Sequence, residues 1–158
     1  MKLYIKQKVF TLGDTFTVMN ESGETVYTAE GEIFTFGKKL HVYDAAGNEV
    51  IYLEQRLFAF RYCFDLTVMG QEAGSVRKEI SFFHPVFSLD MPGWDIEGDF
   101  FAHEYTVTEN GREVAAISKE WMTWGDSYEL TVHEEKNTLT ALAVMLAIDC
   151  INALASNN

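Results

Sequence analysis

LTALAVMLAIDCINAL, residues 139–154, decides the fold because sixteen consecutive residues are almost wholly apolar. With Asn137 and Thr138 as candidate N-caps, we expect a helix over about 138–155. A helix that is apolar on every side is buried in a protein core or in a membrane. Sixteen residues span about 24 Å, less than the roughly 30 Å hydrocarbon core of a bilayer, and Asp149 would oppose insertion. The stretch therefore predicts the core helix of a soluble protein, with no transmembrane segment.

The residues before this helix alternate between polar and apolar side chains, which is typical of strands. Asn20–Gly23 and Asp44–Gly47 are turn signals, and further turns follow at residues 69–72 and 109–111. Counting the runs between such signals gives about a dozen short strands before residue 134. All the connections are short, so an antiparallel meander is expected.

A hairpin-like unit recurs along this region. Phe16, Leu40 and Phe64 each open a strand-like run, and they are spaced 24 residues apart. Each of the first two runs is followed by a glycine turn and a valine, at Gly23 and Val26 and at 47 and 50. Such self-similarity is evidence for a repeated architecture rather than for a particular chemistry.

The helix and the strands fit one another in size. A six-residue strand rises about 20 Å, which nearly matches the helix, whereas eight strands enclose only their own side chains. The sequence therefore predicts a mainly β fold, in which a barrel of about twelve antiparallel strands encloses a C-terminal axial α-helix. Residues 1–158 contain no linker-like stretch, so they are expected to form a single domain.

The chain resembles the LURP-one-related proteins, whose domain is tubby C-terminal-like, in its bacterial form. The resemblance covers essentially residues 3–154 and rests on five ordered blocks: TLGDTFTVMNESGETVYTAEG (11–31), FGKKLHVYDAAGNEV (36–50), GWDIEGDF (93–100), VAAISKEWMTWGDSYEL (114–130) and AVMLAIDCI (143–151).

The resemblance implies a twelve-stranded barrel around a C-terminal helix, related also to phospholipid scramblases. It implies no settled activity. Tubby proteins bind phosphoinositide head groups through basic side chains, but that basic motif has no position-by-position match here. The Cys-rich palmitoylation segment and the calcium-binding motif of scramblases are missing as well. Within the resemblance, Trp94 and Gly98 are interpreted as a packing aromatic and a close-approach glycine.

Charge is distributed unevenly along the chain. The formal net charge is −12, yet residues 1–40 contain five lysines and five acidic residues and are neutral. An acidic field repels a polyanion, so nucleic-acid binding is not expected. An anionic ligand would have to bind the neutral N-terminal third.

The lysines of that third are the candidate ligand-binding residues. If the strand edges that carry them adjoin, they would form a basic site for anionic head groups: Lys2, Lys6, Lys8, Lys38 and Lys39. The alternative, which the sequence favours, is that these lysines protect an exposed edge strand from aggregation.

Other titratable residues could have a chemical role, but each of them also has a simpler structural explanation. Asp95, Glu97 and Asp99 alternate and could offer oxygens to a hard cation, but they lack EF-hand spacing, and acidic strand faces are often merely solvated. Cys63 could pair with His84 or His103 as a nucleophile, but its aromatic surroundings (LFAFRYCF) favour a buried, inert thiol. No catalytic residue, metal ligand or cofactor is therefore assigned.

The sequence favours a non-enzymatic, soluble binding or scaffold module whose partner is an unknown protein or a lipid head group. Two alternatives remain: a peripheral membrane protein that recognises phosphoinositide or other anionic lipid head groups, and an enzyme with a pocket at the barrel rim. A cytoplasmic location is expected, because MKLYIKQKVF is not a signal peptide and because Cys63 and Cys150 lie in apolar contexts. Asp149, buried in the helix, should be paired near the barrel mouth.

Overall fold

The computed structural model describes residues 1–6, 15–32, 36–100, 102–122 and 125–156. Within them, twelve strands precede a short 3₁₀ turn and one long helix. The strands are β1 (Lys2–Lys6), β2 (Thr15–Met19), β3 (Thr25–Gly31), β4 (Lys39–Asp44), β5 (Glu49–Gln55), β6 (Cys63–Val68), β7 (Gln71–Lys78), β8 (Phe87–Asp90), β9 (Trp94–Asp99), β10 (Glu104–Glu109), β11 (Arg112–Met122) and β12 (Gly125–Val132).

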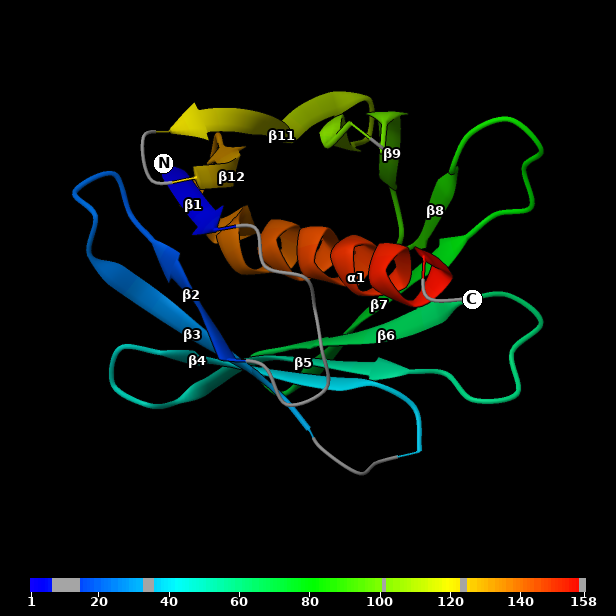
Figure 1. The fold of residues 1–158 in the computed structure, drawn as a ribbon, viewed down its shortest axis with the longest axis horizontal. Helices are drawn as coiled ribbons and strands as arrows, with labels where there is room; N and C mark the ends of the chain where they lie inside the picture. Colours follow the sequence, from blue (N-terminus) through cyan, green and yellow to red (C-terminus); the bar gives the residue numbers. More distant parts are fainter. Residues whose placement is uncertain (7–14, 33–35, 101, 123–124, 157–158) are drawn as a thin grey trace.

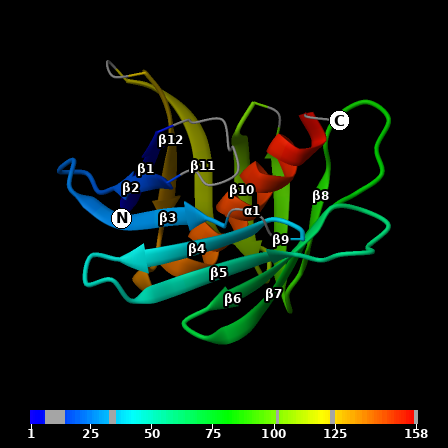
Figure 2. The ribbon, with the colours of Figure 1, turned by 60° about the horizontal axis from the view of Figure 1, so that its bottom comes forward.

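All twelve strands form one antiparallel sheet that wraps around the helix. Its order is β8-β7-β6-β5-β4-β3-β2-β1-β12-β11-β10-β9. Strands that follow one another in the chain are paired, with the exception of β8 and β9, and β1 pairs with β12. The two edges of the sheet, β8 and β9, are consecutive in the chain and leave the barrel nearly closed (Figures 1 and 2). The predicted fold is confirmed.

Side chains that alternate to the inner face build the core. Leu40, Leu53 and Leu66 lie opposite one another on β4, β5 and β6, and each has no more than 1% of its surface exposed. Phe16 and Phe64, which mark the recurring unit in the sequence, are buried as well. The repeat therefore corresponds to successive hairpins that present equivalent side chains to one interior.

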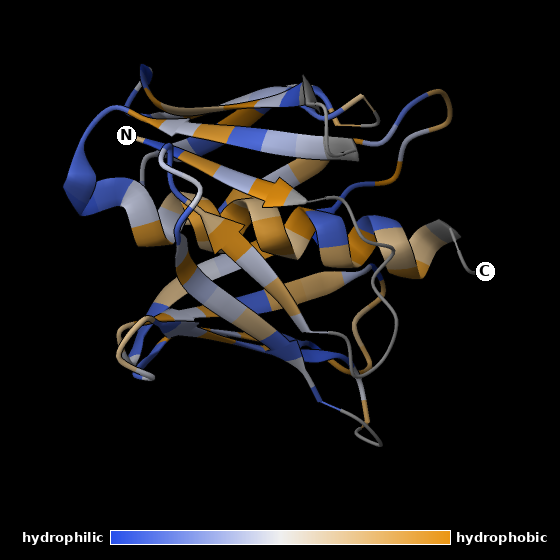
Figure 3. Cartoon of the chain, turned by 60° about the vertical axis from the view of Figure 1, so that its left-hand side comes forward, coloured by the Kyte–Doolittle hydropathy of each residue, from blue (hydrophilic) through white to orange (hydrophobic). Residues whose placement is uncertain are grey.

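The helix α1 (Thr138–Ser156) follows a 3₁₀ turn, η1 (Glu135–Asn137), and runs through the middle of the sheet. Figure 3 shows its hydrophobic turns enclosed by strands, and every residue from 141 to 151 is buried. Its alanines keep it narrow enough to fit inside twelve strands.

The bounds of α1, Thr138–Ser156, agree with the predicted helix over about 138–155. Thr138 has helical dihedrals (φ −59°, ψ −52°), so it is the first residue of α1 rather than a cap, and η1 precedes it. Residues 135–155 together are long and apolar enough to cross a membrane by length and composition, so a predicted length of about 24 Å did not exclude a membrane span. Burial gives the better criterion, because 67% of the apolar window lies inside the protein.

The β1–β12 closure is reinforced at the start of the chain. The Met1 amine donates a hydrogen bond to the Val132 carbonyl at 3.1 Å, and the Thr138 hydroxyl donates to Met1 Sδ at 3.5 Å. The first strand, the last strand and the first helical turn are thereby joined at one point.

Gly98 sits where two backbones approach closely near the open edge of the barrel. A Cβ on this residue would lie 2.5 Å from the Glu104 carbonyl oxygen and 2.6 Å from Tyr105 Cα, and its φ is +139°. Trp94, on the same strand, is half-buried and packs on the core. The close-approach glycine and the packing aromatic are both confirmed.

Candidate functional site

Three loops carry large apolar side chains that point into solvent. Phe36, Phe58, Phe60, Phe82 and Phe83 are each 91–104% exposed, and neighbouring aliphatic residues on the same loops are also exposed. We call this set the aromatic loop surface: Phe36, Leu57, Phe58, Phe60, Ile80, Phe82 and Phe83. Exposed apolar patches on a soluble protein mark binding surfaces more often than scattered single residues do.

The three loops lie at one end of the barrel. Strand register places the start of β4 beside the end of β5 (Lys39 opposite Glu54), and the start of β6 beside the end of β7 (Cys63 opposite Arg77). The β3–β4, β5–β6 and β7–β8 loops therefore leave the sheet in the same direction. Figures 1 and 2 show the β5–β6 and β7–β8 loops extending at the end where α1 finishes.

Contacts between the loop bases hold this end together. Arg61, in the β5–β6 loop, forms an ion pair with Glu79 of the β7–β8 loop. The Lys78 amide donates a hydrogen bond to the Tyr62 carbonyl at 2.9 Å. The bases of these two loops are therefore fixed with respect to one another, although the loop tips are exposed.

The β3–β4 loop is attached to the same assembly. The Gln55 amide donates to the Lys38 carbonyl at 2.9 Å, and the Lys38 amide donates to Gln55 Oε1 at the same distance. Gly37 lies so close to Leu57 that a Cβ there would be 2.8 Å from Leu57 Cδ2. Phe36 thus belongs to the same surface as the β5–β6 loop.

Phe58 adds a sign of strain at the tip of its loop. Its φ is +60°, a left-handed conformation that is rare for a bulky residue, and its side chain is fully exposed. No burial of that side chain compensates for the strained backbone. Such strain persists mainly where it serves a function.

The three segments that carry the aromatic loop surface are basic, although the chain is acidic. Residues 36–39, 55–63 and 77–87 contain six of the twelve lysines and arginines but only one acidic residue, Glu79. Their net charge is +5, so the rest of the chain carries −17. The carboxylates of Glu32 and Asp65, which pair with Lys39 and Arg56, reduce the local excess to +3.

This surface was not predicted from the sequence, where the aromatic run LFAFRYCF was interpreted as the buried surroundings of Cys63. In the structure Leu57–Phe60 are exposed and the Pro85 region is a loop, whereas Cys63 is buried as predicted. The available signal was the loss of alternation between the charged residues Arg56 and Arg61.

The five candidate lysines do not gather as a single described site. Lys2 lies at the opposite end of the barrel from the aromatic loop surface and forms a 2.8 Å ion pair with Glu129. Lys38 is buried and Lys39 lies 4.0 Å from Glu32, both at the aromatic loop end. The Lys6 side chain and all of Lys8 lie outside the described part of the chain.

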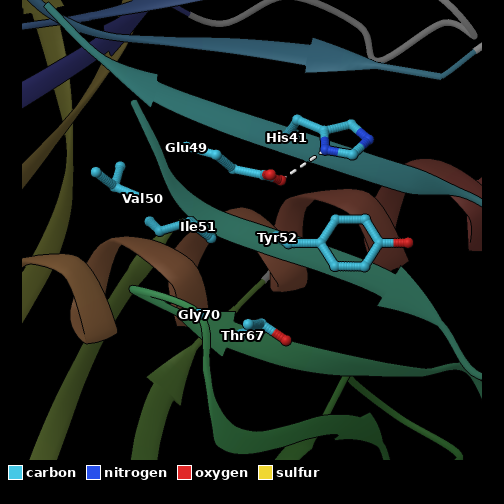
Figure 4. Close-up of a pocket in the computed structure, with 7 residues that line it drawn as sticks. All are labelled: His41, Glu49, Val50, Ile51, Tyr52, Thr67 and Gly70. Atoms are coloured by element: carbon cyan, nitrogen blue, oxygen red, sulfur yellow. Dashed lines mark hydrogen bonds and ion pairs between the residues drawn. The ribbon is translucent and has the colours of Figure 1, made fainter. Parts of the chain in front are cut away.

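A second feature is a pocket of about 290 Å³ on the outer side of β4, β5 and β6 (Figure 4). Its lining residues are His41, Glu49, Val50, Ile51, Tyr52, Thr67 and Gly70. His41 Nδ1 lies 2.6 Å from Glu49 Oε1, and its Nε2 lies 2.6 Å from Glu32 Oε1. The imidazole also stacks on Tyr52, with ring centroids 4.9 Å apart.

This arrangement shifts the pKa values of His41 and Tyr52. Burial would lower the pKa of His41, but the hydrogen bonds to Glu32 and Glu49 outweigh it and raise the pKa. Burial also raises the pKa of Tyr52 to about 12. The two ring nitrogens face carboxylates on opposite edges of the ring, so a single cation cannot bind the imidazole, Glu32 and Glu49 together. Both ring nitrogens of His41 are therefore engaged by carboxylates, and neither is free to act as a general base.

A third cluster lies inside the barrel around Asp149. The Asp149 side chain is buried and its Oδ1 is 3.7 Å from His103 Nδ1. His103 stacks on Tyr128 at 4.2 Å, with 3.1 Å between the Tyr128 hydroxyl and His103 Nε2. The Tyr105 hydroxyl is buried without a hydrogen-bond partner among the described residues, and burial, with the charge of Asp149, raises its pKa. Asp149 is buried as predicted, but the predicted pairing is only a contact with His103 at 3.7 Å, which is longer than a hydrogen bond.

The remaining chemical candidates are placed separately. Asp95, Glu97 and Asp99 are exposed along the edge strand β9, and Asp99 accepts a hydrogen bond from the Ala102 amide. Within the described residues, no three His, Cys, Asp or Glu side chains are grouped as a metal would require. His84 lies in an exposed loop and Cys63 in the core.

Comparison with known proteins identifies the family. The family model described as LURP-one-related matches residues 1–149. The chain belongs to the LURP-one-related family.

Two further comparisons give a bacterial relative in sequence and a plant protein with a similar fold. The chain is 28% identical over 151 residues to "Uncharacterized protein YxjI" of Bacillus subtilis (strain 168), covering 96% of this chain and 93% of the relative. The X-ray structure of the Arabidopsis thaliana protein AT5G01750 matches with a TM-score of 0.58 and 15% identity, covering 96% of this chain and 90% of that one. The plant structure supports the fold of this LURP-one-related chain and carries no information on its function.

Proposed function

We propose that this LURP-one-related protein is a non-enzymatic binding module that docks through the aromatic loop surface. The observation that carries the proposal is the grouping of five phenylalanines, each at least 91% exposed, at one end of the barrel. Leaving such side chains in water costs roughly 1.5–3 kcal/mol each compared with burying them, and Phe58 holds a strained backbone in addition. A binding partner that covers these loops would recover that free energy.

The rest of the molecule is consistent with binding rather than catalysis. The axial helix occupies the interior that other barrels use for ligands. Cys63 and Cys150 are buried thiols, and burial raises the pKa of Cys150 to about 12, so it is a poor nucleophile. His41 is engaged by two carboxylates. We place this activity in the cytoplasm, where thiols remain reduced.

Site-specific photo-crosslinking in cells tests this proposal without assuming a partner. Benzoylphenylalanine would replace Phe60 on the aromatic loop surface or Met69, which is 64% exposed in the β6–β7 turn at the other end. We expect crosslinked products, whether protein or lipid, at Phe60 and few at Met69. Equal crosslinking at the two positions, or none at Phe60, would contradict a docking role for this surface.

A further inference from the structure

We propose that the aromatic loop surface inserts into the interface of an anionic lipid bilayer. This inference rests on the proposed function and names the partner of the same surface. It differs from head-group recognition by the N-terminal lysines, because here the apolar loop tips enter the membrane and the basic residues behind them contact the lipid phosphates.

The shape of the surface favours a bilayer. The phenylalanines project from three separate loops, and their 91–104% exposure means that they pack on almost nothing within the protein. A protein partner would need a separate, shaped pocket for each tip, because the cores of protein interfaces are as tightly packed as protein interiors. A fluid interface accommodates separate apolar projections, and it is where aromatic side chains gather in membrane-bound proteins.

Basic residues lie behind the tips, at the depth where lipid phosphates would lie. Arg77 and Lys78, at the end of β7, are half-buried and form no ion pair with the residues that the structure describes. Among the residues that the structure describes, Lys39 has one ion-pair contact, with Glu32 at 4.0 Å. Long basic side chains can extend along an apolar surface and place their charge at the head-group level.

The remaining charge orients the molecule. With Glu32 and Asp65 counted among them, the three loop segments carry +3 and the rest of the chain carries −15, so an anionic membrane repels the rest of the molecule on balance. The three loops are therefore the part of this end that an anionic surface attracts. Apolar insertion and electrostatic attraction therefore favour the same three loops. The exposed phenylalanines alone would not establish this orientation, and neither would the lysines alone.

Vesicle flotation with the full chain tests the proposal. At 0.1 M salt we expect at least tenfold stronger partitioning into phosphatidylcholine vesicles that contain one quarter phosphatidylglycerol than into phosphatidylcholine alone. Phe58→Ser with Phe60→Ser, and separately Phe82→Ser with Phe83→Ser, should each weaken binding at least tenfold. Met69→Ser, which removes an exposed apolar side chain at the opposite end, should leave it unchanged. Arg77→Gln with Lys78→Gln should reduce the dependence on phosphatidylglycerol and on salt.

A depth measurement keeps the test independent of how well the serine variants fold. Tryptophan introduced by Phe60→Trp should be quenched by brominated lipid, whereas that introduced by Met69→Trp should not. The proposal is overturned if the unaltered protein does not bind the anionic vesicles, if the serine variants bind as it does, or if the two tryptophans are quenched equally. Protein crosslinks at Phe60 without vesicle binding, or loop variants that change only self-association, would also overturn it while leaving the docking role in place.

Discussion

Asp149 and His103 meet inside the barrel as two neutral groups, with 3.7 Å between Oδ1 and Nδ1. Burial raises the pKa of Asp149 to about 8, and burial, followed by the charge of Lys119, lowers the pKa of His103. Near pH 7 the carboxyl therefore keeps its proton and the imidazole lacks its second one. The contact is a polar anchor for the helix rather than the ion pair that the residue types suggest.

This anchor predicts a pH dependence of stability. In the unfolded chain an aspartate has a pKa of about 3.9, so between about pH 4 and pH 8 the folded state holds an additional proton at Asp149. The free energy of unfolding should then fall as pH rises through this window, by at most about 1.4 kcal/mol per pH unit. Asp149→Asn should remove this slope and make the protein more stable than the unaltered chain at pH 9. Urea unfolding at pH 5 and pH 9 measures both effects.

Asp149→Ala provides the comparison at the same position. It removes the side-chain oxygen that faces His103, and an unsatisfied buried group costs about 1–3 kcal/mol. At pH 5 the alanine variant should therefore be less stable than the asparagine variant. If both variants keep the stability and pH profile of the unaltered protein, Asp149 is not a buried anchor.

His41 should stabilise the protein at low pH. Because its folded-state pKa is raised by Glu32 and Glu49, its contribution is complete below about pH 6.5 and is lost as pH rises through the folded pKa. His41→Gln should cost about 1 kcal/mol at pH 5.5, since solvent screens these partly exposed pairs, and progressively less as the pH rises through the folded pKa. His133→Gln is the control, because His133 and Glu113 form a similar 2.6 Å pair with side chains almost half exposed. Equal losses in the two variants would argue against a special role for His41.

Gly98 should not tolerate a side chain. Gly98→Ala would place a Cβ 2.5 Å from the Glu104 carbonyl oxygen, so overpacking should cost about 1–3 kcal/mol in addition to backbone strain. Gly47→Ala is the matched control, because Gly47 also has positive φ (+86°) but nothing within 4 Å of its Cβ. The difference between the two melting temperatures isolates the close approach. Similar melting temperatures would contradict it.

The axial helix should be essential for the barrel. Truncation after Glu135 removes α1 and leaves the inner face of the sheet without its core, so we expect insoluble or molten protein that binds a hydrophobic dye. Leu146→Ala, at a residue with no exposed surface, should cost about 2–5 kcal/mol and remain cooperative. A soluble truncated chain with a cooperative unfolding transition would refute the role assigned to the helix.

At Phe58, a substitution that raises the stability of the protein should weaken its binding to vesicles. Phe58→Gly relieves a left-handed backbone that costs a bulky residue about 1–2 kcal/mol, which exceeds the added entropy of the unfolded chain. Stability should therefore rise by up to about 1 kcal/mol, while vesicle binding weakens. Phe60→Gly has no positive φ to relieve and should lower both. Loss of stability in both variants would show that the Phe58 backbone is not strained.

The architecture could be predicted because its causes are local and repeated. Phe16, Leu40 and Phe64 recur at one spacing, and the apolar run at 139–154 needs an enclosure of a particular size. Short antiparallel hairpins then leave few ways to arrange the strands. The helix bounds were predicted closely, at about 138–155 against Thr138–Ser156, whereas the 3₁₀ turn at Glu135–Asn137 was not predicted.

The aromatic loop surface could not be predicted in the same way. An apolar run such as Leu57–Phe60 has the composition of a buried strand, and only the tertiary structure shows that it crosses from β5 to β6 outside the core. The lysine hypothesis assumed that two strand edges adjoin, whereas register puts Lys2 and Lys39 at opposite ends of the barrel. The His41 bridge depends on residues from three segments, for which the sequence has no local pattern.

The pairing of β1 with β12 has a consequence for biosynthesis. Lys2 lies opposite Thr131, so the first strand stays unpaired until a partner 129 residues further along the chain has been translated. The helix that fills the interior is translated later still. Until then, a nascent chain on the ribosome presents an uncovered apolar sheet with an unpaired first strand, the kind of intermediate that aggregates. Folding should therefore be slow, late and dependent on chaperones, with completion of the barrel as the last event after synthesis rather than a gradual process during it.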